Sequence, residues 1–510
     1  MSSTVCLPWR IALLGLALAG SAGFADEPRG VVGPFVAAAP MELGDATPLA
    51  AVGMQPETAV AISRNGRRLA VGTHFGEIRL YEIGQSPRGP RVTLRWRRRM
   101  AECLIKQVAF SPDGRWLYYA EQGVDGFLYG ASLQAETVGG EEEWRYRLAN
   151  DLQPGPAPAQ DDPFGLFQTP GWYGLSVLDN GDLVALGVHA WGDYRDTSTM
   201  RRRSRIYRFA SGGEIRWAFP ASAAAPVSLV DMAVDPAGRH VVALVSVAGD
   251  QSPEERWLKP GCVVALDGAT GKRLGDCQLE PLRPYYPHVM FWQSLSISAD
   301  GHAAAVGLDD GRGALVDLPS LKSPRYVRLG DPIRLGGVAV SARVTSSHFV
   351  SGKVALFQTG PSNIAAAESA SRAVAPPGPH PFARYLHAVA ADSGQVVWRY
   401  RNGFELKGFA ASGDGRWLLC PCLREASDEE GVPIGGAVLY HQNTTGPGRP
   451  PDVVGFYSLA GVPYHRAAMA KNAAAAAVIE TPFRHAESGR TVGGYRLHVL
   501  ATAVESKEEP

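Results

Sequence analysis

The stretch QVAFSPDGRWLYYAE at 107–121 decides the fold. It holds an apolar segment, a polar tight turn with glycine and a second apolar segment, which together predict a β-hairpin. Related copies are AVAISRNGRRLAVGT at 59–73, GLSVLDNGDLVALGV at 174–188, DMAVDPAGRHVVALV at 231–245, SLSISADGHAAAVGL at 294–308, GFAASGDGRWLLCPC at 408–422 and the degraded AAMAKNAAAAAVIET at 467–481. The chain is therefore a repeat of one hairpin unit.

A second signature closes several units. It is a strand, a glycine-containing turn and a strand that often carries Trp, as in IYRFASGGEIRWAF at 206–219, VVALDGATGKRLGDC at 263–277 and HAVAADSGQVVWRY at 387–400. An atypical unit is expected before 408, with strands near 336–343, 353–359 and 385–391. Four antiparallel strands repeated about every 50 residues predict an all-β fold, a single β-propeller of eight blades with seven as the alternative.

The two halves of the unit resemble two known propeller repeats. The first half resembles WD40-like bacterial repeats, with Ser111-Pro112-Asp113-Gly114 as the best match. The second half resembles the quinoprotein-type (PQQ-like) repeat, whose A-x-D-x-x-T-G-x-x-x-W pattern is matched in part by Asp267-Gly268-Ala269-Thr270-Gly271-Lys272 and by Asp392-Ser393-Gly394 with Trp398. The resemblance spans about 50–503 and implies a fold rather than a function, because propellers host many roles. The Trp residues are expected to pack between neighbouring blades.

The composition is that of a globular protein. Of the 510 residues, 45% are hydrophobic and 20% charged, and 50 Lys and Arg balance 50 Asp and Glu. The lack of a basic excess argues against nucleic acid as the main partner. Length alone suggests about three domains at roughly 150 residues each, but the repeat predicts one. The 58 Gly and 38 Pro are then the turns and loops of the blades.

The chain begins with the features of a secretory signal. Arg10 precedes the apolar run IALLGLALAGSA at 11–22, and small residues follow before Asp26. The run is shorter than the roughly 20 residues of a membrane span, so we predict a cleaved signal peptide at 1–25. An uncleaved anchor is the alternative. We expect a segment at 26–50 that contributes a closing strand, a propeller at 51–503 and a tail at 504–510, with the mature protein in the periplasm.

The lengths of the connections predict where a site lies. In each blade the first strand (A) lines the channel and the fourth (D) is outermost, so B–C and D–A connections share one face. The A–B turns are short, whereas long B–C connections are expected at 189–205, 246–260, 361–384, 423–436 and 482–494. Long loops on one rim of a rigid scaffold favour binding there. We therefore place the site on the B–C/D–A face, at the channel mouth.

Aromatic and polar residues gather at that predicted mouth. They could form a ligand pocket or an anchor patch for a partner protein, and the alternative is that they pack loops against neighbouring blades. Glu102, Lys106, His74 and Arg466 also fall at this face. The candidates for binding are Trp172, Tyr173, His189, Trp191, Tyr285, Tyr286, His288, Trp292, Tyr464 and His465.

Five cysteines remain after the signal. Cys262 and Cys277 flank a hairpin, and pairing Leu266 with Arg273 would place them directly opposite one another. A cross-strand disulfide is then plausible in an oxidising compartment, with two free thiols as the alternative. Cys420 and Cys422 lie two apart around Pro421, and Cys103 could pair with either. No set of metal ligands lies close in the sequence, so no metal site is predicted.

The sequence has no recognisable catalytic motif. G-x-S-x-G, H-E-x-x-H and G-x-x-x-x-G-K-[ST] are all missing, and so is the adjacent Cys-Cys pair typical of quinone-dependent alcohol dehydrogenases. The sequence thus favours a non-enzymatic periplasmic propeller, monomeric or part of a hetero-complex, that binds a protein or small ligand without a cofactor. The alternative is a quinoprotein-like or amine-dehydrogenase-like oxidoreductase subunit, which would use PQQ or calcium.

Overall fold

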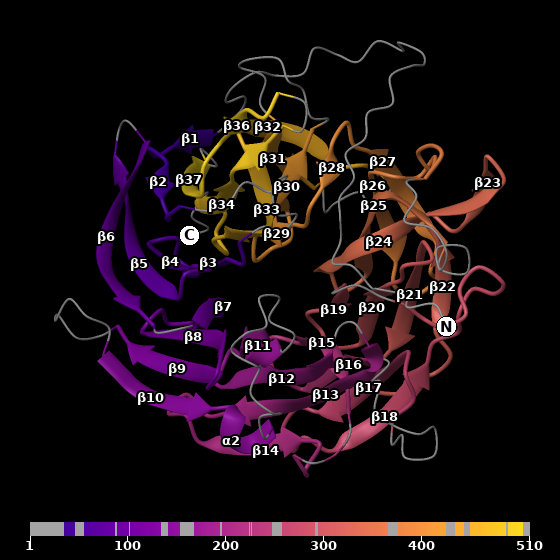
Figure 1. Cartoon of the computed structure of the whole chain (residues 1–510), viewed down its shortest axis with the longest axis horizontal. Helices are drawn as coiled ribbons and strands as arrows, with labels where there is room; N and C mark the ends of the chain where they lie inside the picture. The colour runs from indigo at the N-terminus through magenta and orange to yellow at the C-terminus, as the bar shows by residue number, and fades with distance from the viewer. Residues whose placement is uncertain are drawn as a thin grey trace, which may run out of the picture.

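The computed structural model consists almost entirely of strands arranged around a centre (Figure 1). The only helix among the described residues is the short α2 (Ala149–Leu152). The structure describes residues 35–45, 56–86, 89–100, 103–133, 141–152, 168–193, 196–223, 225, 227–246, 258–290, 294–365, 376–424, 434–442, 449–485 and 488–502.

The first half of the ring consists of antiparallel meanders, each of four strands that follow one another in sequence. Two of these meanders share one sheet, because Gly171 pairs with Gln122 across them. The strands are β3 (Ala59–Ile62), β4 (Arg68–Gly72), β5 (Glu77–Ser86) and β6 (Gly89–Arg99); β7 (Cys103–Phe110), β8 (Trp116–Gly123), β9 (Phe127–Ser132) and β10 (Glu141–Arg147); β11 (Gln168–Val177), β12 (Leu183–Asp193), β13 (Asp196–Phe209) and β14 (Ile215–Phe219); and β15 (Leu229–Val234), β16 (His240–Val245), β17 (Cys262–Asp267) and β18 (Arg273–Gln278).

The second half repeats this plan with local additions. A short β23 precedes the long β24. Two short strands, β28 and β29, each pair with a different part of β30. The strands are β19 (Leu295–Ile297), β20 (Ala303–Gly307), β21 (Arg312–Asp317) and β22 (Arg325–Arg328); β23 (Ile333–Leu335), β24 (Val338–Ser351), β25 (Val354–Ile364), β26 (Tyr385–Ala390) and β27 (Val396–Arg401); and β28 (Glu405–Leu406), β29 (Ala410–Ala411), β30 (Trp417–Leu423), β31 (Gly435–His441) and β32 (Asp452–Leu459).

The last meander joins the two ends of the chain. It contains β33 (Val462–Met469), β34 (Ala475–Thr481) and β37 (Arg496–Thr502), and its outer strand is β1 (Phe35–Ala37) followed by β2 (Met41–Glu42). Phe35 pairs with Thr502, so an N-terminal strand completes a C-terminal sheet. A small hairpin of β35 (Phe483–Arg484) and β36 (Thr491–Val492) lies between β34 and β37.

The ring of meanders confirms the predicted all-β propeller. The number of blades stays a prediction: it is eight if each meander counts as one blade, including the two that share a sheet. Apolar clusters lie between successive sheets, for example Leu186 of β12 packed with Val241 and Val264 of the next meander. Because each sheet buries a face against each neighbour, the core is divided among the interfaces around the ring.

The repeated turn has one geometry. In the quoted stretch, the Ser111 hydroxyl bonds the Asp113 carboxylate at 2.5 Å and accepts from the Trp116 amide at 2.9 Å. The following Gly114 has a φ of +70°, a left-handed conformation that glycine adopts without steric cost. The Ser–Asp or Ser–Asn bond recurs in the turns at 63–66, 298–301 and 412–415. The predicted hairpins are therefore confirmed at the level of their hydrogen bonds.

Tryptophans of the outer strands bind the next meander, as predicted. The Trp217 indole of β14 donates to the Gly268 carbonyl at 2.9 Å and covers Gly271 in the turn between β17 and β18. Trp144 of β10 repeats the arrangement: it donates to the Ser211 carbonyl at 2.9 Å and covers Gly213. A Cβ on either glycine would lie 2.6 Å from the indole ring, so the glycine is needed for the ring to pack.

This packing makes Gly271 costlier to replace than an equivalent turn glycine. Gly271→Ala is expected to lose about 1 kcal/mol for its left-handed φ of +69° and about 1–3 kcal/mol more from the clash with Trp217. Gly114→Ala is the matched control, because its φ is +70° and nothing lies within 4 Å of its added Cβ. Urea unfolding of both variants measures the difference, and equal losses would contradict the packing role.

The expected opposition of Cys262 and Cys277 is wrong. Leu266 does pair with Arg273, but a bulge beside Leu266 shifts the rest of the ladder by one residue, so Cys277 pairs with Val263. A shift of one residue moves a side chain to the other face of a sheet. Cys262 therefore packs toward β12 and β13, whereas Cys277 packs toward β20 and β21. All five described cysteines are free thiols.

Alkylation before digestion tests this register. Protein purified without reductant is expected to yield Cys262 and Cys277 in separate, alkylated peptides after unfolding in the alkylating reagent. The same digest made after reduction supplies the reference masses. A peptide pair linked through these two cysteines would contradict the bulged register.

Three connections differ from the expected loops. The segment 189–205 is mostly strand, because β12 continues to Asp193 and β13 begins at Asp196. The start of 361–384 belongs to β25, and 482–494 contains the β35–β36 hairpin. In each segment, antiparallel pairing continues into residues that were expected to form a loop. The polar character of these residues did not indicate this pairing. The connections at 247–257, 366–375 and 425–433 lie outside the described residues.

Candidate functional site

Charged and aromatic side chains from the first strands of several meanders lie at equivalent positions of the repeat. Lys106 of β7, Tyr173 of β11 and Arg466 of β33 each stand immediately before the conserved start of the hairpin repeat within this chain, as does Lys407 between β28 and β29. The ring places these equivalent positions on one face, the B–C/D–A face. We call the group formed by Glu57, Lys106, Tyr173, Arg202, Tyr464, His465 and Arg466 the mouth cluster.

Glu57 is the anionic member of the mouth cluster. Its carboxylate accepts a hydrogen bond from the Tyr464 hydroxyl at 2.9 Å and lies 3.9 Å from the Lys106 ammonium. Burial raises the pKa of Glu57, but the charges of Lys106 and Arg466 and the Tyr464 bond together hold it below its usual value. Glu57 is therefore a carboxylate shared among several donors.

Lys106 lies between polar and aromatic partners. Its ammonium donates to the Gln122 amide oxygen at 3.1 Å and lies 4.2 Å from the centre of the Tyr173 ring. The Arg202 guanidinium lies 5.7 Å from the centre of the same ring. The Tyr173 ring therefore makes cation–π contacts with two cations. Burial lowers the pKa of Lys106, and the Arg466 and Arg202 charges lower it further, whereas Glu57 opposes them.

Arg466 and His465 complete the cluster on the β33 side. The Arg466 guanidinium donates to the Lys106 carbonyl, which joins the last meander to the second. The His465 side chain is solvent-exposed, yet the surrounding protein and the Arg466 charge lower its pKa. Lys407 bonds Glu405 at 2.5 Å and adds its charge to the surroundings of His465. His465 is thus a neutral ring beside several cations.

Some predicted site residues are structural. Trp172 is fully buried, donates from its indole to the Gly126 carbonyl at 2.8 Å and packs on Tyr207 and Phe209. His189 is also buried, within the β12–β13 hairpin. Both side chains belong to the interior of the third meander, because β11 and β12 turn them away from the channel. Their role as ligand contacts stays a prediction.

The loop between β18 and β19 contributes residues of mixed exposure. Tyr286 is buried, and its hydroxyl bonds the Ser341 hydroxyl at 2.7 Å and the Asp309 carbonyl at 3.0 Å, which holds the loop to β24. Tyr285 is half-buried and His288 is exposed. None of these contacts joins the loop to the mouth cluster. The side chains of the predicted Trp191 and Trp292 lie outside the described residues, as does Glu102.

Glu57, Lys407 and Arg202 are not among the residues that the sequence placed at the mouth, and repeat position could have located the first two. Glu57 stands two residues before the first hairpin and His465 two before the last, while Lys106, Tyr173, Lys407 and Arg466 each stand one before. Aligning the copies by their turns superposes these positions. Arg202 offers no such signal, because it reaches the cluster only through the length of β13.

A second polar group lies at the start of β15. The Asp231 carboxylate accepts from the Met232 amide at 2.9 Å and from the Leu295 amide of β19 at 3.1 Å. Burial raises its pKa to about 7, against which the two backbone bonds act. Asp231 therefore links two neighbouring meanders and changes its charge near neutral pH.

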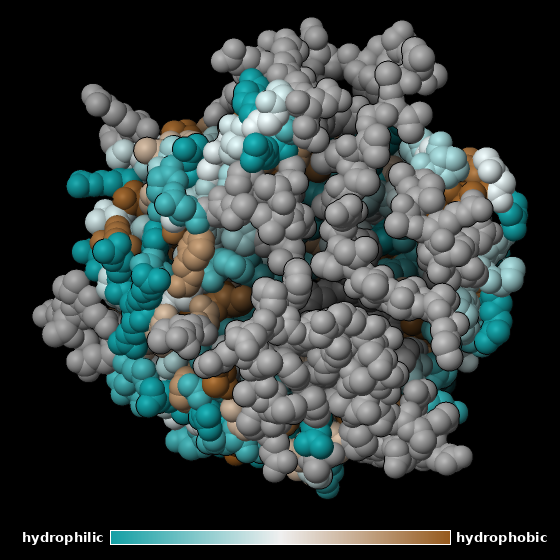
Figure 2. Space-filling view, viewed as in Figure 1, coloured by the Kyte–Doolittle hydropathy of each residue, from teal (hydrophilic) through white to brown (hydrophobic). Residues whose placement is uncertain are grey.

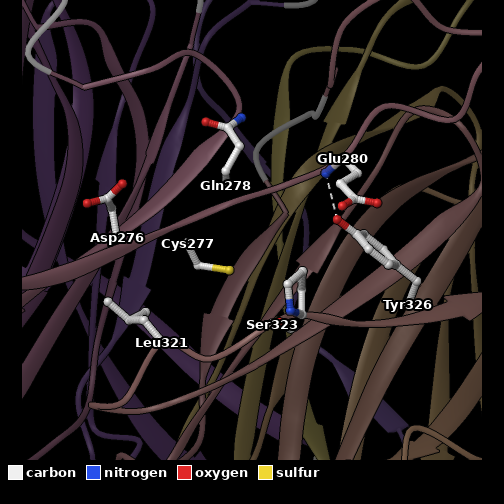
Figure 3. A pocket seen from close by; sticks show the side chains of 8 residues that line it. Asp276, Cys277, Gln278, Glu280, Leu321, Ser323 and Tyr326 are labelled. Atoms are coloured by element: carbon white, nitrogen blue, oxygen red, sulfur yellow. Dashed lines mark hydrogen bonds between the residues drawn. The ribbon is translucent and has the colours of Figure 1, made fainter.

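A pocket of about 500 Å³ lies elsewhere, at the rim between β18 and β22 (Figure 3). The Glu280 amide donates to the Tyr326 hydroxyl at 2.6 Å beside it. Burial raises the pKa of the Cys277 thiol, so this thiol is a poor nucleophile. The lining residues are Asp276, Cys277, Gln278, Glu280, Leu321, Ser323, Pro324 and Tyr326. The pocket thus lacks the convergent charges found at the channel mouth.

The described residues contain neither a set of metal ligands nor a membrane-spanning helix. Among them, no group of three or more His, Cys, Asp or Glu side chains is arranged to hold a metal ion. No helix within these same ranges is long and apolar enough to cross a membrane.

Comparison with known proteins identifies the fold. No protein-family model matches the chain, and no curated protein is similar to it. Among solved structures, the C-terminal WD40 domain of Sif2 matches with a TM-score of 0.54 at 10% identity, over 94% of this chain and 99% of that chain. The chain therefore has a WD40-like β-propeller fold, and an identity this low shows the fold alone.

Two other solved propellers match less well. Chaetomium thermophilum Sqt1, bound to the N-terminus of the ribosomal protein L10, has a TM-score of 0.45 at 15% identity, over 71% of this chain and 80% of that chain. The β-propeller domain of Cps50 (Swd1) from Myceliophteria thermophila has a TM-score of 0.41 at 12% identity, over 92% and 99%. The predicted likeness to PQQ-like repeats stays a prediction.

Asp231 gives the structure a testable pH dependence. Its raised pKa means that the folded protein holds this proton more tightly than the unfolded chain, so its contribution to stability is present near pH 4 and is lost as pH rises through about 7. Asp231→Asn removes that loss. The free energy of unfolding of the variant minus that of wild type is therefore expected to increase from pH 4 to pH 8.

The control for this measurement is Asp113→Asn. Its carboxyl lies in an exposed turn, where the Ser111 bond lowers its pKa, and Asn65 occupies the equivalent turn position in the first hairpin. The Asp113 difference is therefore expected to stay nearly flat over this range. Urea unfolding at several pH values measures both, and a flat profile for Asp231→Asn would refute the assignment.

Proposed function

We propose that this chain is a non-enzymatic propeller that binds a partner protein or ligand through its B–C/D–A face. The mouth cluster supports the proposal, because it gathers charged and aromatic side chains from four meanders at one end of the channel. Binding surfaces on rigid scaffolds commonly combine such aromatic and cationic anchors. We further propose that the protein acts in the periplasm after cleavage of the predicted signal peptide at 1–25.

The geometry of the mouth cluster fits recognition better than acid–base catalysis. Glu57 is held as a carboxylate and His465 as a neutral ring, while Lys106 and Arg466 surround them with positive charge. Acid–base catalysis needs one protonated and one deprotonated group whose pKa values lie near the working pH. The mouth cluster offers no such pair. No observation favours the oxidoreductase subunit that the PQQ-like resemblance suggested.

Site-specific photo-crosslinking tests which face binds. A photoreactive amino acid at His74, an exposed residue whose ring nitrogen accepts from the Glu57 amide at 3.2 Å, is expected to crosslink a partner in extract from cells that make the protein. The matched probe is at Arg115, exposed in an A–B turn on the opposite face. Crosslinks at Arg115 alone, or turnover of a substrate by protein that yields no crosslink, would overturn the proposal.

A further inference from the structure

We propose that the mouth cluster binds carboxylate groups of an acidic polypeptide segment. This inference rests on the proposed function and names the chemistry of the partner. Its basis is an excess of positive charge held in place by the ring itself. Among the described residues of the cluster, Lys106, Arg202 and Arg466 carry positive charge and Glu57 carries negative charge. The adjoining Lys407, which also lowers the pKa of His465, forms an ion pair with Glu405.

The excess positive charge destabilises the folded protein because part of it is buried. Lys106 is only 8% exposed. Its counter-charge, the Glu57 carboxylate, also accepts a hydrogen bond from Tyr464 and interacts with the Arg466 charge. Bringing like charges out of water raises the free energy of the folded protein unless a counter-charge is added. A bound carboxylate supplies that charge, so the folded cluster is prepared for an anion before the anion arrives.

The fixed geometry of the cations supports a specific contact. Cation–π contacts with the Tyr173 ring position Lys106 and Arg202, and the Arg466 guanidinium donates a hydrogen bond to the Lys106 carbonyl. Donors that are already oriented lose less conformational entropy on binding. Lys and Arg donors bind carboxylates through charge-assisted hydrogen bonds, which are stronger than those between neutral groups. The positions spread over four meanders, which suits an extended segment with several carboxylates.

The repeat explains how the cluster arises. Lys106, Lys407 and Arg466 hold the same position in three of the hairpin copies, and Tyr173 holds it in a fourth. In the copy at 231–245, which lies beyond β11, the same position holds Val230, while Thr58 holds it between Arg466 and Lys106. The positive charge is therefore concentrated on one arc of the mouth instead of spread around it. An acidic segment is expected to bind across this arc, between β28 and β11.

Fluorescence anisotropy with defined peptides tests the proposal. The probes are fluorescein-labelled hexaglutamate with a free C-terminus, its C-terminal amide, and hexaglutamine with a free C-terminus. Hexaglutamate is expected to bind at least about tenfold more tightly than hexaglutamine, and its affinity is expected to fall as salt rises. Loss of binding with the amide would assign the contact to the terminal carboxylate, and retention would assign it to side chains.

Variants separate a contact from a structural effect. Lys106→Gln and Arg466→Gln are each expected to weaken hexaglutamate binding at least about tenfold, the size of one charge-assisted bond. Glu57→Gln is expected to strengthen it, because one competing negative charge is removed. Arg115→Gln and Arg416→Gln, both exposed in A–B turns, are the controls and should bind as wild type. The melting temperature of each variant shows whether it is folded.

The outcomes also distinguish this inference from the proposed function. Equal binding of hexaglutamate and hexaglutamine, weaker binding by Glu57→Gln, or equal losses in the A–B turn controls would overturn the acidic ligand. If crosslinks at His74 are nevertheless obtained, the binding face stands and only its ligand chemistry is wrong. If hexaglutamate binds as expected but crosslinks form only at Arg115, the partner-binding face is wrong while the anion contact stands.

Discussion

The pairing of β1 with β37 is the interaction on which the ring depends. Phe35 to Ala37 lie beside the last strand of the chain and complete the sheet that also contains β33 and β34. Without β1, the long edge of β37 would present unpaired backbone groups to solvent. The same sheet is bound to its neighbour by a buried group in which the Tyr457 hydroxyl bonds His498 at 3.0 Å and His498 bonds Glu480 at 2.9 Å.

Closure of the ring also creates the mouth cluster. Arg466 lies near the end of the chain and Lys106 near its beginning, yet the guanidinium of one bonds the carbonyl of the other.

The outer surface has a different charge pattern. Most arginines of β6 are exposed, and Figure 2 shows this left-hand edge of the ring as largely hydrophilic. Arg95 there is paired with Glu82 at the surface, where charge pairs contribute little to stability.

Local sequence patterns predicted the hairpins because their turns are decided within a few residues. Ser111, Asp113 and Gly114 make their hydrogen bonds to one another and to the adjacent backbone, so no distant contact is needed. The sequence predicted that tryptophans pack between blades, but the tertiary structure decided that Trp217 contacts Gly268 and Gly271 of the next meander. The Cys262 and Cys277 register was not predictable, because the bulge beside Leu266 breaks the even count on which the expectation depended.

The sequence alone determined the hairpin repeat and the all-β propeller, since the turns and the alternation along each strand are short-range patterns. Only the tertiary structure decided which charged and aromatic residues meet. Trp172 and Tyr173 are adjacent in sequence, but alternation along β11 buries the first and turns the second toward Lys106. Glu57 and Tyr464 are 407 positions apart, and ring closure brings them to 2.9 Å.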